Sequence, residues 1–370
     1  MNLPAVSDKL TTMLMTIRAC LILIALYSTY KSYHFTGYTD FEVYYRYAFK
    51  VISYWKSEPV SFAIEPGNTS PFRYFPLIGA LLSPLALLPY EVSRALWALL
   101  GWVFYIYSLE KLKKIFKLSV FEFLIVILGT LRFARDNSSI GQIACLTLAL
   151  LVLAMAHYPE KKSNFAMLIT TLIKVQPLGF LSIAIFQKNV RYLFTFFSLF
   201  LIFFGCSYVL VGKNALEAWI GLFLQSHDVL SPATIGNQSI YGALFRHIDT
   251  PKIYFIGLFL VSSLIFIKSW HKKNWDTFYG FSTLTALLPI FGILTWKNTY
   301  VFWCIPFAYF IKKYGYKAVL PCAVLFQVLS QGIIGKSLNA ISLSYGFLPL
   351  IALVFIFYWM IKTLRAPPQP

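Results

Sequence analysis

Long apolar segments alternate along the chain with short polar ones. Blocks such as Tyr192 to Val211 and Phe347 to Ile361 approach the ~20 residues that a helix needs to cross ~30 Å of hydrocarbon. A membrane β-barrel would show shorter segments of alternating polarity, so the pattern predicts an all-α polytopic membrane protein. The segments predicted to span or enter the membrane are 12–31, 92–110, 118–134, 140–157, 163–174, 176–187, 191–211, 251–269, 277–295, 298–311, 316–334 and 344–362.

Two of these segments are too short to cross alone. Residues 163–174 and 176–187 each make about 18 Å of helix, and they meet at Lys174–Pro177. We expect a broken helix hairpin that enters from the cytoplasm and turns near the outer leaflet, in a fold of about 11–12 transmembrane or half-membrane helices. Irregular backbone at such depth is tolerated only where it lines a cavity, so the hairpin predicts a pocket.

We expect one membrane domain over residues 1–370, because no linker, low-complexity tract or internal repeat divides the chain. The first apolar segment, Thr11 to Tyr30, has no small-residue cleavage site and is expected to remain as the first span. The five cysteines lie in apolar stretches without CxxC pairing, which is typical of inert packing residues.

The composition supports a membrane protein, and the distribution of charge predicts how it is oriented in the membrane. Apolar residues make up 58% of the chain, charged residues only 12%, and the mean hydropathy is +0.68. Lys plus Arg outnumber Asp plus Glu by 32 to 14, and the excess lies in six short loops, which we expect to be cytoplasmic. They hold Lys111, Lys113, Lys114 and Lys117; Lys161 and Lys162; Lys188 and Arg191; Lys268, Lys272 and Lys273; Lys312, Lys313 and Lys317; and Lys362 and Arg365. The expected partner of this charge is the bilayer and not nucleic acid.

This topology places both termini in the cytoplasm and 76–88 in a helix at the outer interface. It leaves a first outer loop at 31–91, a second at 212–250, and shorter outer turns at 132–139, 296–298 and 335–342. Ionisable residues near membrane depth are functional candidates.

The first outer loop is predicted to contain an amphipathic helix. Thr39 and Glu42 have the spacing of a capping box, which puts Asp40 in the first helical turn. Asp40, Tyr44 and Tyr47 then share one face of the helix. A simple helix-start charge is the alternative reading of Asp40.

An ordered set of motifs extends over most of the chain. It consists of Asp40–Tyr45, Pro71–Leu77, Gly141–Gln142, Lys174–Pro177 and Asn237–Gly242 followed by Arg246. From about Tyr38 to Pro306, the chain resembles the polyprenyl-phosphate-mannose-dependent mannosyltransferases of glycosyltransferase family 87, in the GT-C superfamily.

The resemblance implies an enzyme whose active site faces the periplasm or lumen and which takes a sugar from a polyprenyl-phosphate carrier. In GT-C enzymes the acid at the start of the first outer loop activates the acceptor hydroxyl, and Asp40 matches that position. The histidines that often follow the tryptophan of the 296 stretch are absent, since Trp296 precedes Lys297 and Asn298. Phe75 likewise replaces a proline of the usual Tyr-Pro-Pro.

Transfer from a phosphate carrier needs a base for the incoming hydroxyl and positive charge for the departing phosphate. Asp40 is the predicted base, and a single carboxylate predicts inversion. The candidate phosphate-binding cations are Lys174, Arg246, Lys297, Arg132 and Arg135, the last two of which can also be snorkelling span ends. The candidate substrate-lining residues are Tyr44, Tyr74, Arg73, Gln142, Gln176, Asn237, Gln238, Trp296 and Asn298.

No cofactor is predicted to be required. The chain has no GxGxxG, Walker or Asp-x-Asp motif, which argues against a nucleotide donor, and its histidines lack metal-ligand spacing. A divalent ion near Asp40 is compatible with the sequence but not predicted.

The resemblance favours mannose as the sugar and implies a glycolipid or glycan as the acceptor, and a bacterial inner membrane is the expected location. The sequence leaves open arabinose or aminoarabinose as the carried sugar, the linkage and the oligomeric state. A polyprenyl-phosphate-linked transporter or flippase is the alternative from another functional class, because broken helices and midplane cations occur there too.

Overall fold

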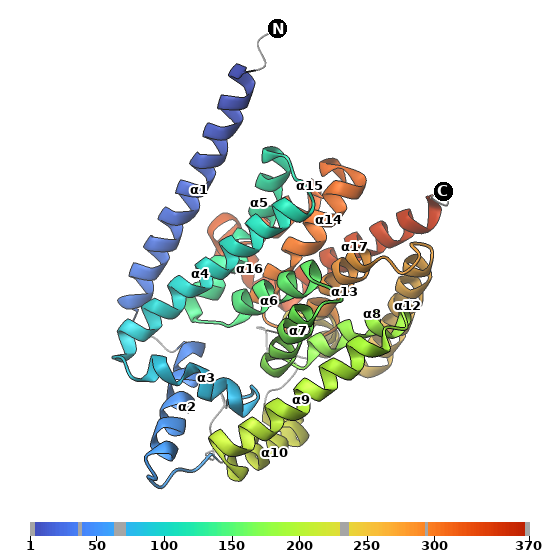
Figure 1. Ribbon diagram of the computed structural model, residues 1–370. Coiled ribbons are helices and arrows are strands. Elements are labelled where there is room, and N and C mark those ends of the chain that lie inside the picture. The colour runs from blue at the N-terminus through green and yellow to red at the C-terminus, as the bar shows by residue number, and fades with distance from the viewer. Residues whose placement is uncertain (1–3, 36–38, 63–71, 230–236, 293–294, 367–370) are drawn as a thin grey trace.

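The computed structural model describes residues 4–35, 39–62, 72–229, 237–292 and 295–366 (Figure 1). Within these ranges the chain forms α-helices and short 3-10 helices, with no strand beyond an isolated bridge between Asn237 and Trp296. The all-α polytopic architecture predicted from the sequence is therefore confirmed. Pro71, which opens one motif, and residues 230–236 of the second outer loop lie outside the described ranges.

In the described part of the chain, five helices are long and apolar enough to cross a membrane. They are α1 (Pro4–Tyr33), α4 (Tyr90–Ile115), α9 (Val190–Val211), α12 (Pro251–His271) and α17 (Phe347–Arg365). The other helices are α2 (Asp40–Trp55), α3 (Pro76–Ala86), α5 (Val120–Ile140), α6 (Ala144–Ala156), α7 (Lys161–Ile173), η1 (Gln176–Phe180), α8 (Leu181–Phe186), α10 (Lys213–Val229), α11 (Ile240–His247), α13 (Thr277–Phe291), η2 (Lys297–Trp303), α14 (Cys304–Tyr314), η3 (Tyr316–Ala318), α15 (Leu320–Val328) and α16 (Gln331–Ser344).

The helix break predicted between segments 163–174 and 176–187 is present in the structure. Helix α7 ends at Ile173, and Lys174 adopts an extended conformation with φ −141° and ψ 131°. Pro177 lacks a backbone N–H and so cannot continue an α-helical ladder, and the chain resumes as the 3-10 helix η1 before α8. The break leaves Lys174 at the joint of two short helices.

Two of the predicted outer turns are wrong. Residues 132–139 continue helix α5, which ends only where Gly141 takes the left-handed conformation at φ 72°. The polar residues there remain helical because tertiary packing gives them partners, as when the Asn137 side chain accepts a hydrogen bond from Ala144 N at 3.1 Å. Residues 335–342 belong to α16, which is kinked at Gly335.

The start of α2 is as predicted, but the capping box is not formed. Helix α2 begins at Asp40, after Thr39 in an extended conformation. The Thr39 hydroxyl makes no cap and lies 3.0 Å from the Tyr90 hydroxyl, while Glu42 pairs with Arg46 one turn further along α2. Tertiary partners have therefore replaced the local cap.

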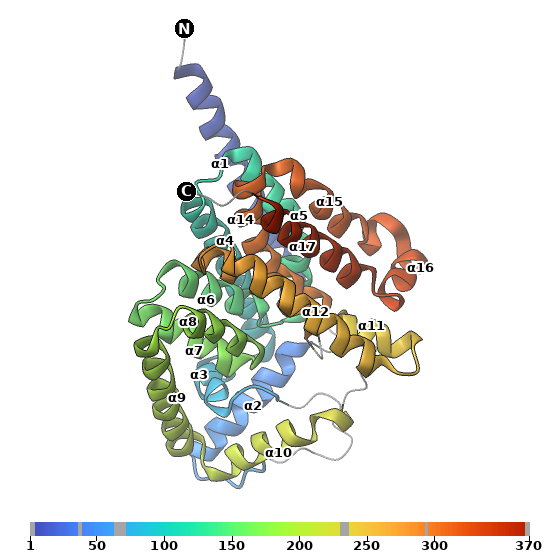
Figure 2. The same cartoon turned by 90° about the vertical axis from the view of Figure 1, so that its right-hand side faces the viewer.

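The basic loops lie together on one side of the bundle. The Gln187 side chain donates to the Trp275 carbonyl at 2.7 Å, Lys272 donates to the Leu364 carbonyl, and the Phe116 and Phe278 rings are 5.7 Å apart. Helices α2, α3 and α10 lie at the other end, away from the projecting N-terminus of α1 (Figures 1 and 2). Charge is thus distributed unevenly between the two ends, as the positive-inside rule requires of a membrane protein.

Candidate active site

The first turn of α2 is held against the junction of α5 and α6. A Cβ atom on Gly141 would lie 2.5 Å from Phe41 Cβ, and its φ of +72° also favours glycine. The Gly141 carbonyl in turn accepts a hydrogen bond from the Trp97 indole at 2.9 Å. Because Phe41 is fully buried here, its neighbour Asp40 is fixed at the edge of the core. Gln142 of the same junction is also buried.

Asp40 is partly buried and faces two tyrosines. Tyr44, one turn along α2, places its hydroxyl 2.8 Å from that of Tyr74, and the Asp40 charge acts on both rings. Burial raises the pKa of both tyrosines, so both hydroxyls keep their protons. Burial also raises the pKa of Asp40 to about 6, against the opposing effect of the Lys174 ammonium.

Lys174 acts on this carboxylate, and a second cation, Arg73, accompanies Tyr74. The Phe75 backbone N–H donates to the Leu172 carbonyl at 3.0 Å, which ties the 72–75 segment to the end of α7 and so to Lys174. Arg73 lies beside Tyr74, and its Nη2 atom is buried without a hydrogen-bond partner among the described residues. Burial lowers the pKa of Arg73. Asp40, Tyr44, Arg73, Tyr74 and Lys174 are called the Asp40 cluster below.

Arg132, Arg135, Asp136 and Lys297 form a second group, the Asp136 cluster. Lys297 Nζ lies 2.9 Å from one Asp136 oxygen, and the exposed Arg135 lies 3.6 Å from the other. Arg132 is buried one turn away, over the Phe133 ring, and its Nε and Nη1 atoms have no partner in the described part of the chain. Of the predicted phosphate-binding cations, two are thus already paired with an acid.

Next to Lys297, the Asn298 side chain is 1% exposed, and neither of its polar atoms has a partner within the described ranges. The structure therefore leaves Asn298 with unused hydrogen-bonding capacity, as expected of a substrate-lining residue. Trp296 is 39% exposed and pairs with Asn237 through the isolated bridge.

The 237–246 segment, called the 237–246 clip below, is held in place by several hydrogen bonds. Asn237 accepts a hydrogen bond from Thr295 N at 3.0 Å, and Gln238 donates to the Leu343 carbonyl at 3.0 Å. Arg246 donates to three backbone carbonyls, of Asn237 at 3.0 Å, Leu343 at 3.1 Å and Ser344 at 2.8 Å. These bonds join α11 to the end of α16, so Arg246 has a positioning task of its own.

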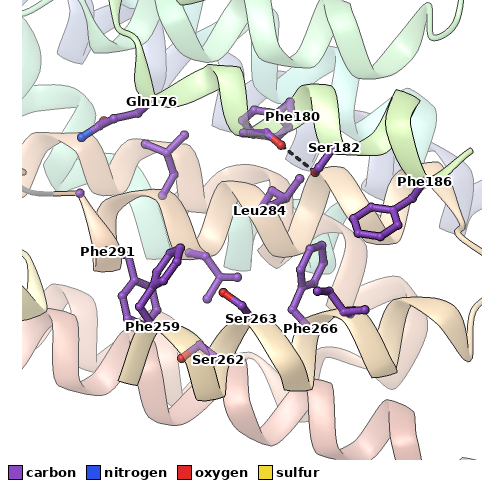
Figure 3. Close-up of a pocket in the computed structure, with 15 residues that line it drawn as sticks. Gln176, Phe180, Ser182, Phe186, Phe259, Ser262, Ser263, Phe266, Leu284 and Phe291 are labelled. Atoms are coloured by element: carbon purple, nitrogen blue, oxygen red, sulfur yellow. Dashed lines mark hydrogen bonds between the residues drawn. The ribbon is translucent and has the colours of Figure 1, made fainter. Parts of the chain in front are cut away.

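An apolar cavity of about 410 Å³ lies between η1 with α8 on one side and α12 with α13 on the other (Figure 3). Phenylalanine, leucine and isoleucine side chains form most of its lining, and Gln176 lies at one end, two residues after Lys174. The Gln176 amide closely approaches Gly292, where a Cβ atom would lie 2.6 Å from it. The cavity is therefore mostly apolar, with three serines in its lining and the Gln176 amide at the hairpin break.

Comparison with known families connects these features. A family model for glycosyltransferase family 87 matches residues 72–295, more than half of the chain. The chain belongs to glycosyltransferase family 87. As a member of this family it is a membrane glycosyltransferase. A comparison with curated proteins gave no match.

The family 87 match covers some of the candidate residues but not others. It includes Arg73, Lys174, Gln176 and the 237–246 clip, but it begins after Asp40 and ends before Trp296. The structure nevertheless joins Asp40 to the matched region, because Tyr74 and Lys174 both act on it.

Two features of this family 87 chain were missed from the sequence. The Lys297 pairing with Asp136 joins residues 161 positions apart, and no local signal indicates it. A pocket at the hairpin was predicted, but its opposite wall on α12 was missed, although Phe259 and Phe266 recur two helical turns apart around Ser262 and Ser263.

Proposed function

We propose that this family 87 enzyme transfers a sugar, with mannose favoured, from a polyprenyl-phosphate carrier to a glycolipid or glycan acceptor. The observation that carries the proposal is the Asp40 cluster, in which a partly buried carboxylate with a pKa of about 6 faces a lysine at the hairpin break. A base with this pKa is mostly ionised at neutral pH yet accepts a proton readily, which suits general-base catalysis.

In the proposed reaction the Asp40 carboxylate takes the proton of the acceptor hydroxyl while that oxygen attacks the anomeric carbon. The bond from that carbon to the carrier phosphate breaks, and the phosphate leaves with the bonding electrons. Lys174 and Arg73 stabilise the negative charge that develops on it. One displacement inverts the anomeric centre, so a β-linked carrier sugar gives an α-linked product.

The donor would lie with its phosphate at the hairpin break and its isoprenoid chain in the phenylalanine-lined cavity. The cavity supports this orientation because its polar end, Gln176, follows closely on Lys174. Arg132 in α5 and Lys297 in η2, both of the Asp136 cluster, are proposed to help bind the carrier phosphate. Arg246 is assigned to positioning, since backbone carbonyls occupy its guanidinium. No metal is needed for this step.

We further propose that the enzyme lies in a bacterial inner membrane, with both termini in the cytoplasm and the Asp40 cluster facing the periplasm. The clustering of the basic loops opposite α2 and α3 supports this orientation.

The test uses the purified protein in nanodiscs with a radiolabelled polyprenyl-phosphate sugar and a lipid acceptor. Asp40→Asn keeps the size of the side chain but removes the base, so transfer is expected to fall ~10²- to 10⁴-fold while donor binding persists. Glu42→Gln is the matched control, because Glu42 lies in the same turn but pairs with Arg46. Full transfer by Asp40→Asn would exclude the mechanism. Carrier translocation without a covalent product in the unmutated protein would instead favour a flippase.

A further inference from the structure

Arg94 is a buried arginine that the proposed reaction does not use. It lies in the second turn of α4 and is 3% exposed. One of its terminal nitrogens, Nη2, donates to the Tyr33 carbonyl at 3.0 Å, while its Nε atom has no partner in the described part of the chain. A buried cation costs free energy unless its surroundings compensate for the lost water. The surroundings of Arg94 therefore indicate what its charge stabilises.

A helix end and two aromatic rings compensate for this charge. Tyr33 is the last residue of α1, and the carbonyl groups at a helix C-terminus carry partial negative charge. The guanidinium carbon lies 5.2 Å from the centre of the Tyr90 ring and 5.9 Å from that of Phe35, within the range of a cation–π interaction. Arg94 thus ties the end of α1 to Tyr90, the first residue of α4.

Tyr90 in turn contacts the start of α2. Its hydroxyl lies 3.0 Å from the hydroxyl of Thr39, the residue before Asp40. Its ring centre lies 6.0 Å from that of Phe41, the residue after Asp40, and 5.3 Å from that of Tyr45, one turn further on. Tyr90 therefore holds the chain on both sides of the Asp40 carboxylate.

These contacts matter because the first turn of α2 has no side-chain cap. Thr39 makes no cap hydrogen bond, and Glu42 pairs with Arg46. An uncapped first turn leaves backbone N–H groups without intrahelical partners and is less stable than a capped one. The placement of Asp40 then depends on Tyr90, and an error of ~1 Å in the position of a catalytic group can cost ~10²-fold in rate.

We propose that Tyr90 and Arg94 are positioning residues, which hold the first turn of α2, and with it the Asp40 carboxylate, in place for the acceptor hydroxyl. Tyr33, Thr39, Tyr90 and Arg94 are called the Arg94 network below. This role rests on the proposed function, which makes Asp40 the base. Neither positioning side chain touches a substrate. The network therefore acts on kcat for transfer and leaves the affinity for the donor unchanged.

The first test removes one hydroxyl. Tyr90→Phe keeps the ring, and with it the contacts to Arg94 and Phe41, but loses the bond to Thr39. In the nanodisc assay, kcat is expected to fall about 3- to 10-fold, with an unchanged Kd for a labelled polyprenyl-phosphate sugar. Thr39→Val removes the same bond from the other side, so the double variant is expected to lose no more kcat than either single variant.

Tyr192→Phe is the matched control. The Tyr192 hydroxyl also lies 3.0 Å from another side-chain hydroxyl, that of Ser163, but this pair joins α9 to α7 at their first turns, next to basic loops. Its removal is expected to lower the Tm about as much as Tyr90→Phe does and to leave kcat unchanged. A role in folding alone would give the two variants the same kcat.

The second test changes the arginine. Arg94→Lys keeps a positive charge near the Tyr33 carbonyl but loses the planar guanidinium, whereas Arg94→Met loses both. In the folded fraction of Arg94→Met, kcat is expected to fall about tenfold or more, and Arg94→Lys is expected to recover part of it. The donor Kd is expected to be unchanged in both variants.

Asp40→Asn in the same assay separates this role from the proposed function. If Asp40→Asn retains full transfer, the proposed base is wrong and its positioning residues are overturned with it. If Asp40→Asn loses transfer while Tyr90→Phe and Tyr192→Phe have equal kcat values, the base is supported and the positioning role is overturned. A donor Kd that rises in Tyr90→Phe as much as kcat falls would also overturn the role, because the network would then act on the donor site.

Discussion

The hydroxyl groups of Tyr44 and Tyr74 lie 2.8 Å apart, beside Asp40. Tyr44 belongs to α2 and Tyr74 to the segment that leads into α3, so this bond joins the helix that carries the carboxylate to the first residues of the family 87 match. The pair therefore fixes the face of α2 from which Asp40 projects.

Removing one hydroxyl of this pair is expected to weaken catalysis more than folding. Tyr74→Phe loses a hydrogen bond worth about 0.5–1.5 kcal/mol of unfolding free energy and leaves Asp40 less well positioned. Tyr45→Phe is the control, because its hydroxyl donates to the Leu88 carbonyl at 2.8 Å, outside the Asp40 cluster. We expect similar losses of Tm but a fall in kcat only for Tyr74→Phe. Equal kcat values would assign the tyrosine pair to folding alone.

The pH dependence of transfer follows from the raised pKa of Asp40. The base must be ionised, so activity is expected to rise with pH through about 6 and then level off. The Lys174 ammonium lowers this pKa, so Lys174→Met is expected to move the rising limb to higher pH. Initial rates between pH 4.5 and 8 in overlapping buffers measure the rising limb for the unmutated protein and for Lys174→Met. An unmoved limb in Lys174→Met would place the lysine away from the base.

The contribution of Asp40 to folding stability is expected to decrease as the pH rises, whereas transfer activity increases. The pKa of Asp40 rises from 3.8 to about 6 on folding, so the folded state favours the protonated carboxyl. Its stabilising contribution is complete below pH 3.8 and is lost as the pH rises through about 6. Asp40→Asn is therefore expected to have a higher Tm than the unmutated protein at pH 7 and a smaller advantage at pH 5. Differential scanning fluorimetry tests this, and a lower Tm at pH 7 would contradict it.

Two of the candidate cations are expected to behave differently. Arg246→Met removes three hydrogen bonds from a charged group, each worth ~1.5–3 kcal/mol, so its main effect is expected on unfolding and expression. Lys174→Met is expected to fold normally and to weaken donor binding. Donor titration of the folded fraction, with unfolding measured in parallel, separates the two effects. Normal donor affinity in Lys174→Met, with weak affinity in well-folded Arg246→Met, would mean that Arg246 binds the donor and Lys174 does not.

The phenylalanine-lined cavity is expected to select donors by the length of the isoprenoid chain. Ser263 lines the cavity, and Ser263→Trp fills part of it (Figure 3). We expect a higher KM for a long-chain polyprenyl-phosphate sugar and an unchanged KM for a short-chain one. Ile256→Trp is the control, because Ile256 is 55% exposed on the same helix and is not part of the lining. Equal effects on both donors would mean that the carrier lies elsewhere.

The sequence by itself determined the fold class, the positions of the five long apolar helices among twelve predicted segments, and the break at Lys174. These follow from local properties: the length of apolar runs measured against the bilayer, and a proline that cannot continue a helix. The sequence also located the start of α2 at Asp40.

Only the tertiary structure decided how the polar residues are used. Thr39 bonds Tyr90 instead of capping its helix, and the turn predicted at 132–139 is helix, where Asn137 accepts a hydrogen bond from Ala144 N. The bond from Tyr44 to Tyr74 likewise joins two segments that are separate in the chain. Hydrogen bonds and charges act over a few ångströms in space, so their partners depend on how the helices pack, which no local pattern encodes.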